Sequence, residues 1–581
     1  MRVGMAAIWI ALFFVVMQGF VLPPDGFMCG DQGAKYLQTR AFADHGPLNP
    51  SIDVRSRDID PDFTHQEPKL KNRRGRLVSE FLWLMPLLGS PFLALFGLRG
   101  LYVVPAVSAL VVFFCAARLA RRRDDPNGAL TALFVLLVTP IAVYGLELWE
   151  HAPAAACVMV IAVLLLPADD APGRGRLFAA GVVSIAAFLF REEAAVALPA
   201  LFLGRALARD RRPGQTTRPL AFIVEGFWCG LGVIAGLIAS APMNLMMYGS
   251  PLPMHLTQDA WEYAKNISYL AVRHDIVTQL FMPMEYPWVY AAALAAGLAA
   301  SLLAWRHQAP DTRRNLALAV VHAAVSVMLG VAVALPIAHL AAGSRLHEAS
   351  NVQSAAHGWA FVPALFYLPW LGDQARTPHA RYLIVSAVLA ILFTTLVVPS
   401  TAGAQWSPRF YLQIAPLLAL PAIEIAWPPS VARRRWLEAI AVWGARTALA
   451  AAIVMIATGI AYLRSAKIQF AGVTHALARF TADGEVVISG VFWVPEVTAT
   501  LAQERRFLFS WNSAEVPTLA ALAVRTGFER FTVVTFPALT HHTAPDAIEV
   551  PGAPCRFVRG ERQFVLEIRG LFLSRYGCES P

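Results

Sequence analysis

The sequence is poor in charge. Only 15% of its 581 residues are Asp, Glu, Lys or Arg, whereas 57% are hydrophobic. Soluble domains carry charge on roughly a quarter of their residues, because charged side chains cover a water-exposed surface. The mean hydropathy is +0.52, and apolar residues gather in runs long enough to cross a hydrocarbon layer of about 30 Å. The composition excludes a soluble globular protein and predicts a polytopic helical membrane protein.

Several sequence motifs are also missing. A glycine-rich phosphate loop is absent, so ATP hydrolysis is not expected. The six Cys residues form no Cys-x-x-Cys pair and no zinc-ligand spacing. Half of them lie in or beside apolar runs, whereas Cys555 and Cys578 lie near the C-terminus, where they could form a disulfide in an oxidising compartment.

Basic residues gather in short clusters between the apolar runs. The first apolar run, residues 5–22, follows Arg2, and later clusters include residues 118–123, 205–218 and 433–435. With about thirteen spans and a cytoplasmic N-terminus, every basic cluster falls on the cytoplasmic side, where Lys and Arg are enriched. We therefore expect a multi-pass protein of the inner (plasma) membrane with an extracytoplasmic C-terminus. This topology accounts for the formal charge of +9, and no aromatic–basic face indicates nucleic-acid binding.

A long loop, residues 23–98, follows the first span. It contains an apolar run at residues 81–96 with Pro and Gly in its middle. Counting this run as a span would break the charge rule, so we interpret it as an interfacial or re-entrant helix lying on the bundle. A true span is the alternative. The transmembrane domain is expected to comprise residues 1–463.

The composition changes in residues 464–581. Segments 485–489, 506–511 and 530–535 have the β-branched and aromatic content of strands, and helical patterns separate them. This alternation predicts a small extracytoplasmic α/β domain. The fold class is therefore an all-α membrane bundle with a C-terminal α/β domain. Stabilisation of the protein or acceptor binding is the expected role of that domain.

Polar motifs recur where the predicted spans meet the outer face. They are GDQGAKY at 30–36, PLLGSP at 86–91, YGSPL at 248–252 and SPRFY at 407–411. Their arrangement resembles the GT-C superfamily of integral-membrane glycosyltransferases, in particular protein O-mannosyltransferases and the lipid A aminoarabinose transferase. The resemblance covers about residues 1–430. It implies a GT-C-like bundle that takes a sugar from a polyprenyl- or dolichyl-phosphate donor.

The resemblance implies a general base directly after the first helix, and Asp31 stands at that position. Such a base removes the proton from the acceptor hydroxyl. Asp25 is the substitute candidate, although its PPDG segment is typical of a turn. Lys35 follows Asp31 by one helical turn and can share its helix face. Two roles stay open for Lys35: binding the donor phosphate or pairing with Asp31.

Glu147, Glu150 and His151 form a second group of ionisable residues at the outer face. Related enzymes place a second acidic residue here, and some use it with the first Asp to hold a divalent metal through oxygen ligands. The spacing departs from the Asp-x-Asp of those relatives. We therefore expect no metal cofactor, with a divalent ion as the alternative. We assign Glu150 to catalysis, where it would orient the acceptor. Glu147 and His151 are assigned secondary roles in binding the acceptor. For all three residues, the alternative is that they anchor the end of the helix.

Arg191 and Arg409 are the expected ligands of the donor phosphate. A guanidinium stays charged and binds phosphate through two parallel hydrogen bonds. Arg191 stands beside Glu192 and Glu193, so an internal ion pair is its alternative. For Arg409 the alternative is anchoring at the membrane interface.

Together these residues predict a hexosyl- or pentosyltransferase of the cell envelope that inverts the configuration of the transferred sugar. Its partners would be a polyprenyl-phosphate-linked sugar, membrane lipids and an extracytoplasmic glycan, lipid or protein acceptor. The main alternative is a membrane transporter or lipid flippase, which would predict inverted repeats and midplane charges that the sequence does not display. A non-catalytic scaffold subunit, in which Asp31 would be dispensable, is a further alternative.

Overall fold

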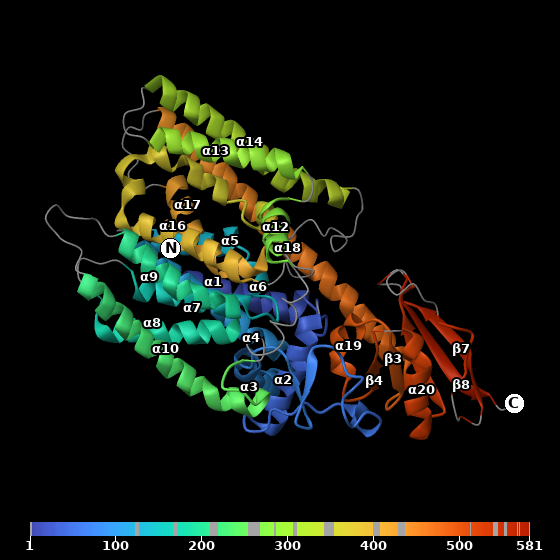
Figure 1. Cartoon of the computed structure of the whole chain (residues 1–581). Coiled ribbons are helices and arrows are strands. Elements are labelled where there is room, and N and C mark those ends of the chain that lie inside the picture. Colours follow the sequence, from blue (N-terminus) through green and yellow to red (C-terminus); the bar gives the residue numbers. More distant parts are fainter. Residues whose placement is uncertain are drawn as a thin grey trace. The chain divides into compact units, whose positions relative to one another are not determined.

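The fold was obtained as a computed structural model of the whole chain (Figure 1). The residues it describes are 3–28, 30–121, 127–166, 172–208, 219–253, 268–283, 286–305, 311–341, 354–398, 407–427, 436–511, 513–537, 544–550, 553, 555–565, 568 and 570–579. Most residues of the basic clusters that set the predicted topology lie outside these ranges.

The chain divides into two compact units. The helical unit comprises Met1–Val15, Val104–Ala241 and Leu256–Tyr462, and the mixed unit comprises Val16–Val103, Pro242–His255 and Leu463–Pro581. Two helices, α10 (Pro219–Tyr248) and α18 (Trp436–Phe480), begin in the helical unit and end in the mixed unit. Because α18 passes residue 463 without a break, the predicted domain boundary lies inside a continuous helix.

The helical unit consists of α-helices with short 3₁₀ and π helices between them, which carry η labels. Its remaining helices are α1 (Val3–Val16), α4 (Val103–Arg121), α5 (Gly128–Val138), α6 (Ile141–Tyr144), α7 (His151–Leu164), α8 (Arg174–Phe190), η4 (Glu192–Val196), α9 (Ala197–Ala208), α12 (Tyr269–Asp275), η6 (Ile276–Phe281), α13 (Pro287–Trp305), α14 (Asp311–Ala341), α15 (Ala355–Gly358), η9 (Val362–Arg376), α16 (Pro378–Val397), η10 (Arg409–Ile414) and α17 (Ala415–Ala426).

Glycine allows α8 and α10 to pack closely in this unit. A Cβ on Gly181 would lie 2.1 Å from the carbonyl oxygen of Cys229, and one on Gly232 would lie 2.1 Å from that of Phe178. Small residues at such crossings let helix backbones approach each other in a membrane, where dispersion contacts drive association.

Eight helices among the described residues are long and apolar enough to cross a membrane. The first is Val3–Val21, formed by α1 and η1 (Met17–Val21), and shorter apolar helices such as α5 and α7 accompany the eight. The predicted class, a polytopic helical membrane protein with a small C-terminal α/β region, is confirmed. The total of about thirteen spans stays a prediction from loop charge.

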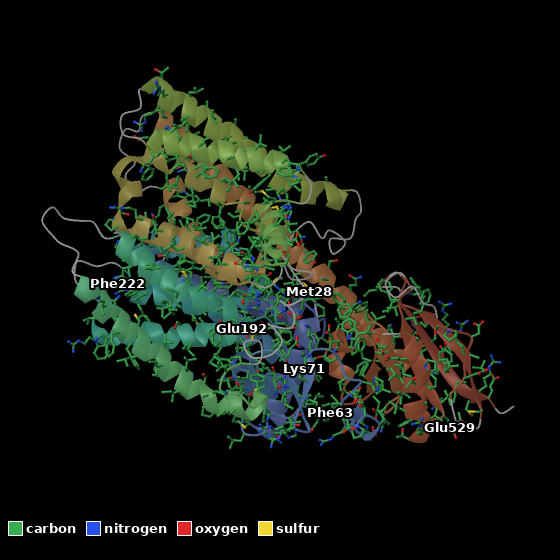
Figure 2. All side chains as sticks on the ribbon, viewed as in Figure 1. Met28, Phe63, Lys71, Glu192, Phe222 and Glu529 are labelled. Atoms are coloured by element: carbon green, nitrogen blue, oxygen red, sulfur yellow. A yellow bond between two sulfur atoms is a disulfide. The ribbon has the colours of Figure 1, made fainter. Side chains whose placement is uncertain are left out.

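The mixed unit begins with the segment after the first span. It contains α2 (Gly30–His45), η2 (Arg55–Asp58), the hairpin of β1 (Leu70–Arg73) and β2 (Arg76–Ser79), α3 (Leu84–Phe96) and η3 (Gly97–Tyr102). Figure 2 labels Phe63 and Lys71 in the stretch between α2 and α3. Within the run at 81–96, residues Leu84–Phe96 form α3, which is followed by Gly97 with φ 58°. The stretch Leu84–Ala120, which includes α3, is one of the candidate membrane spans. The interfacial position of α3 stays a prediction.

A six-stranded sheet completes the mixed unit (Figure 1). Its elements are β3 (Val486–Ser489), α19 (Trp493–Val497), η11 (Ala499–Leu501), β4 (Arg506–Phe509), η12 (Ser513–Glu515), α20 (Val516–Arg525), β5 (Arg530–Thr535), β6 (Ala547–Ile548), β7 (Arg556–Phe564) and β8 (Phe572–Glu579). The strand order is β4-β3-β5-β8-β7-β6, with β3 parallel to β4 and β5, and β8 antiparallel to β5 and β7.

Both faces of this sheet are covered. Val486 and Ile488 pack with residues of α20, whereas Val487 packs with the end of α18 and with α19, as the alternation of side chains along a strand requires. The three predicted strands are confirmed, and the β7–β8 hairpin is an addition to them. A disulfide joins Cys555 to Cys578 across this hairpin.

Candidate functional site

Asp31 lies in the first turn of α2, directly after the first candidate span. A carboxylate in this position interacts favourably with the positive end of the helix dipole. The turns after Asp31 are buried from Gln32 to Thr39, whereas Asp31 itself is half-buried. The structure therefore holds the predicted base on a well-packed helix while leaving part of its side chain accessible.

Two glycines bring the C-terminal part of the chain against this helix. A Cβ on Gly30 would lie 1.5 Å from Oε2 of Glu496, and a Cβ on Gly33 would lie 1.8 Å from the carbonyl oxygen of Glu496. At Gly33 the close atom is backbone, so α19 packs directly on α2, whereas a Cβ at Gly30 would require the Glu496 carboxyl group to shift. Glu496 is 2% exposed, and the contact places its carboxyl group beside the first turn of α2.

Four carboxyl groups and two lysines form what we call the aspartate cluster. Its members are Asp31, Lys35, Glu67, Lys69, Glu80 and Glu496. Burial and the negative charge of Asp31 raise the pKa of Glu496 to about 8. Burial, with the nearby charge of Glu496, also raises the pKa of Glu67 well above its ordinary value. Both carboxyl groups thus favour the neutral, protonated form, as expected for buried acids beside other carboxylates.

The cations of this cluster gather at Phe81. The ammonium nitrogens of Lys35 and Lys69 lie 4.4 and 5.8 Å from the centre of the Phe81 ring. Lys69 forms a 2.8 Å ion pair with Glu80, which is also 3.5 Å from Lys71. Burial acts to lower the pKa of Lys69, but the charge and hydrogen bond of Glu80, together with the charges of Asp31 and Glu496, outweigh burial and raise that pKa. Lys69 therefore stays cationic in the cluster.

The substitute base is engaged elsewhere in the mixed unit. The carboxylate of Asp25 lies 2.7 Å from Nε2 of His475 on α18. The carbonyl of the preceding Pro24 accepts a hydrogen bond of 2.8 Å from Tyr102. These contacts give Asp25 a structural role in fixing the turn before α2.

In the helical unit, Arg191, Arg409, Trp149 and Phe410 form the arginine cluster. The guanidinium carbons of Arg191 and Arg409 lie 5.5 and 5.4 Å from the centre of the Phe410 ring, and that of Arg409 lies 5.2 Å from Trp149. Arg191 also donates a 2.8 Å hydrogen bond to Glu193, so the predicted ion pair of Arg191 is present. The two predicted phosphate ligands therefore share one aromatic side chain.

The group at 147–151 is fully buried next to this cluster. Glu147, Glu150 and His151 are each 1% exposed. The ring of His151 lies 5.5 Å from Trp149 and 5.2 Å from Tyr144. Residues 145–150 form turns between α6 and α7, so Glu147 and Glu150 do not share the face of a continuous helix. Within the described residues no group of three or more His, Cys, Asp or Glu could hold a metal ion.

The predicted site residues thus fall into two sets. The structure brings Arg191 and Arg409 together in the helical unit and groups Asp31 with Lys35 in the mixed unit. Sequence reasoning missed Glu67, Lys69, Glu80 and Glu496. The signal that points to Glu496 is the spacing of Gly30 and Gly33 on one helix face, which is typical of close packing but does not identify the partner.

One protein family matches part of the chain. Residues 82–242 match the family described as dolichyl-phosphate-mannose-protein mannosyltransferase. The predicted resemblance to GT-C glycosyltransferases is confirmed. The family match supports glycosyl transfer as the chemistry of this chain.

Two solved structures share a similar chain path with this protein at low sequence identity. One is ArnT from Cupriavidus metallidurans bound to undecaprenyl phosphate, with 12% identity, 97% of each chain covered and a TM-score of 0.47. Another is the Archaeoglobus fulgidus oligosaccharyltransferase in its apo form, with 12% identity, 92% of this chain and 69% of that chain covered and a TM-score of 0.46. Comparison with curated proteins gives no match.

Proposed function

We propose that this protein transfers a sugar from a polyprenyl-phosphate-linked donor to an acceptor hydroxyl with inversion, and that Asp31 is the general base. The observation that carries the proposal is the position of Asp31, half-buried in the first turn of α2 beside two acids that favour their neutral form. The family match supports the class of donor, since the family is named for a mannose carried on a lipid phosphate.

The residues of the two clusters account for both the proton and the leaving group of this reaction. Asp31 accepts the proton of the acceptor hydroxyl while the acceptor oxygen attacks the anomeric carbon. The bond between that carbon and the phosphate oxygen breaks on the opposite face, and its electron pair leaves with the lipid phosphate. Arg191, Arg409 and Lys35 stabilise the negative charge of that phosphate.

Glu67 and Glu496 adjust the electrostatics around the base. Two ionised carboxylates at close range repel each other, and protonation of one removes the repulsion. Burial and neighbouring charge raise the pKa of both residues, that of Glu496 to about 8, and this shifts both toward the protonated form. Asp31 then carries the negative charge that a base requires.

The buried group in the helical unit serves the acceptor. We propose that Glu150 orients the acceptor hydroxyl, with Glu147 and His151 as its secondary polar contacts. The support for this role is that ionisable groups within a membrane bundle are costly and tend to mark functional sites.

The disulfide supports the orientation of the protein. Disulfides persist in oxidising compartments, and Cys555–Cys578 lies in the C-terminal sheet. We propose that this sheet is extracytoplasmic, that the N-terminus is cytoplasmic and that the protein resides in the inner membrane.

Paired Asp variants test the proposal. The full chain in lipid nanodiscs is given a lipid-phosphate-linked sugar, and transfer to an acceptor glycolipid is measured for the wild type, Asp31→Asn and Asp25→Asn. Asp31→Asn should lower transfer about 1000-fold, as removal of a general base does, whereas Asp25→Asn should retain most activity. Equal activity of Asp31→Asn and the wild type would overturn the proposal. Unchanged transfer with loss of a solute gradient would favour the transporter instead.

A further inference from the structure

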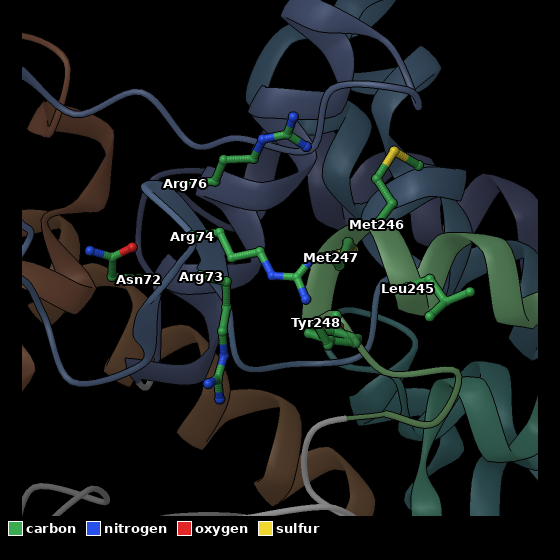
Figure 3. Close-up of a pocket in the computed structure, with 9 residues that line it drawn as sticks. Asn72, Arg73, Arg74, Arg76, Leu245, Met246, Met247 and Tyr248 are labelled. Atoms are coloured by element: carbon green, nitrogen blue, oxygen red, sulfur yellow. The ribbon is translucent and has the colours of Figure 1, made fainter.

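A cavity of about 480 Å³ lies between the β1–β2 hairpin and the C-terminal end of α10, both within the mixed unit (Figure 3). The hairpin contributes Arg73, Arg74 and Arg76, and the helix contributes an apolar wall of Leu245, Met246 and Met247. Among the described residues that line it, none is acidic. The cavity therefore combines a cationic side with an apolar side.

The hairpin turn holds an arginine in an unfavourable backbone conformation. Arg74 has φ 54° and the following Gly75 has φ 76°. A two-residue turn of this kind normally has Asn, Asp or Gly at its first position, because a bulky residue with positive φ is strained. The side chain of Asn72 holds the turn by accepting a 3.0 Å hydrogen bond from the Gly75 amide and donating one of 2.8 Å to the Asp62 carbonyl. Strain of this kind at a well-held turn points to a function for the residue.

The end of α10 is shaped to receive this arginine. Gly249 has φ +72°, and a Cβ there would lie 3.4 Å from a guanidinium nitrogen of Arg74. Tyr248 donates a 2.8 Å hydrogen bond to the carbonyl of Phe81, which fixes the helix end. Figure 3 shows the Arg74 side chain extending from the hairpin toward this end of α10, between Arg73 and Arg76. Both walls of the cavity are therefore rigid.

The position of the cavity along α10 indicates its ligand. The candidate span Ala221–Tyr248 ends at the cavity, and the end of a membrane span lies at the level of the lipid headgroups. Leu245 is 50% exposed, so it offers an apolar surface on this last turn. Within the described part of the chain, Arg74 and Arg76 form no ion pair with a carboxylate.

We propose that this cavity binds the phosphate-bearing headgroup of an anionic membrane lipid. The guanidiniums of Arg74 and Arg76 hold the phosphate through charge-assisted hydrogen bonds, and the apolar wall of α10 receives the upper part of the acyl chains. An inorganic anion would use only the cationic side, which is why the occupant is a lipid. The residues of this site belong to the mixed unit, whereas those of the arginine cluster belong to the helical unit, and the site does not depend on the proposed catalytic reaction.

Lipid retention measured by native mass spectrometry tests this site. The full chain is released from nanodiscs that contain equal amounts of phosphatidylglycerol and phosphatidylcholine. The Arg74→Gln/Arg76→Gln variant should retain about tenfold less phosphatidylglycerol than the wild type, because it loses two charge-assisted contacts. Phosphatidylcholine retention should not change. The control variant Arg525→Gln/Arg530→Gln removes two exposed arginines of the sheet region and should retain phosphatidylglycerol like the wild type.

Three results would overturn the proposal. One is equal retention of phosphatidylglycerol by the wild type and the Arg74→Gln/Arg76→Gln variant with matching melting temperatures. Another is displacement of the lipid by millimolar inorganic phosphate, which would indicate a simple anion site. The last is a variant that retains phosphatidylglycerol like the wild type but retains less added undecaprenyl phosphate, since that would assign the cavity to the lipid of the donor.

Discussion

The aspartate cluster and the arginine cluster both gather two cations around one phenylalanine, but they surround them differently. In the mixed unit, Lys35 and Lys69 flank Phe81 amid four carboxyl groups, two of which have raised pKa values. In the helical unit, Arg191 and Arg409 flank Phe410 with an aromatic neighbour in Trp149.

This difference separates proton chemistry from phosphate chemistry. A carboxylate can accept a proton, whereas a guanidinium remains charged throughout the physiological range and suits an anion. Under the proposed function, the mixed unit would supply the base Asp31, and Arg191 and Arg409 of the helical unit would stabilise the charge of the phosphate together with Lys35. The predictions that follow perturb one cluster at a time.

After the loss of Asp31, the loss of a guanidinium should have the largest effect. Arg409→Gln is expected to lower kcat/KM for the lipid-linked donor about 100-fold, or roughly 3 kcal/mol, the upper range for a hydrogen bond to a charged group. Steady-state rates of sugar transfer at varied donor concentration measure this kcat/KM.

Arg446→Gln is the control, because Arg446 also stacks on tryptophan in the helical unit but lies outside the arginine cluster. An equal loss of kcat/KM in Arg446→Gln would contradict the assignment of phosphate binding to Arg409.

Gly33→Ala should disturb the aspartate cluster through packing. The new Cβ would meet the Glu496 carbonyl oxygen at 1.8 Å, so α19 must move away from α2. Overpacking of this kind destabilises by about 1–3 kcal/mol, seen as a lower melting temperature. Gly175→Ala on α8, where nothing lies within 4 Å of the added Cβ, should be neutral or slightly stabilising. Unchanged melting of Gly33→Ala would contradict the close contact of the two helices.

Glu496→Gln should change the pH dependence of stability, a smaller effect. Burial and the charge of Asp31 raise the pKa of Glu496 from 4.5 to about 8. The folded protein keeps this proton after the unfolded chain has lost it, so its contribution is fully present below pH 4.5 and is lost as the pH rises through about 8.

Melting temperatures at pH 5 and pH 9 check this expectation. Because Gln is neutral at both values, Glu496→Gln should lose less stability than the wild type between them. The exposed Glu529 provides the control, and Glu529→Gln should follow the wild type. Parallel curves for Glu496→Gln and the wild type would mean that Glu496 is ionised in the folded protein.

The sequence predicted the parts of the fold that local patterns encode. Apolar runs located most helices, and the β-branched and aromatic content of residues 485–489 and 530–535 located the strands β3 and β5. The sequence did not predict the β7–β8 hairpin. The residues of these strands are mostly half-buried or exposed, so they lack the apolar alternation that identifies a strand.

The site was predictable only where one segment contains it. Asp31 and Lys35 stand one turn apart on α2, so their proximity follows from the helix repeat. Glu496 is separated from them by more than four hundred residues, and only tertiary packing at Gly30 and Gly33 brings it to α2. The shared contact of Arg191 and Arg409 with Phe410 is likewise a property of packing between distant segments, which single-sequence patterns do not encode.

Donor binding by Asp31→Asn tests the division of roles most directly. The measurement pairs the dissociation constant of the lipid-phosphate sugar with single-turnover transfer, using purified Asp31→Asn and wild-type protein in nanodiscs. If Asp31 acts on the acceptor proton and the cations hold the phosphate, the variant binds the donor within about twofold of the wild type while transfer falls about 1000-fold. Weakened donor binding in proportion to the lost transfer, or transfer at the wild-type rate, would contradict the account.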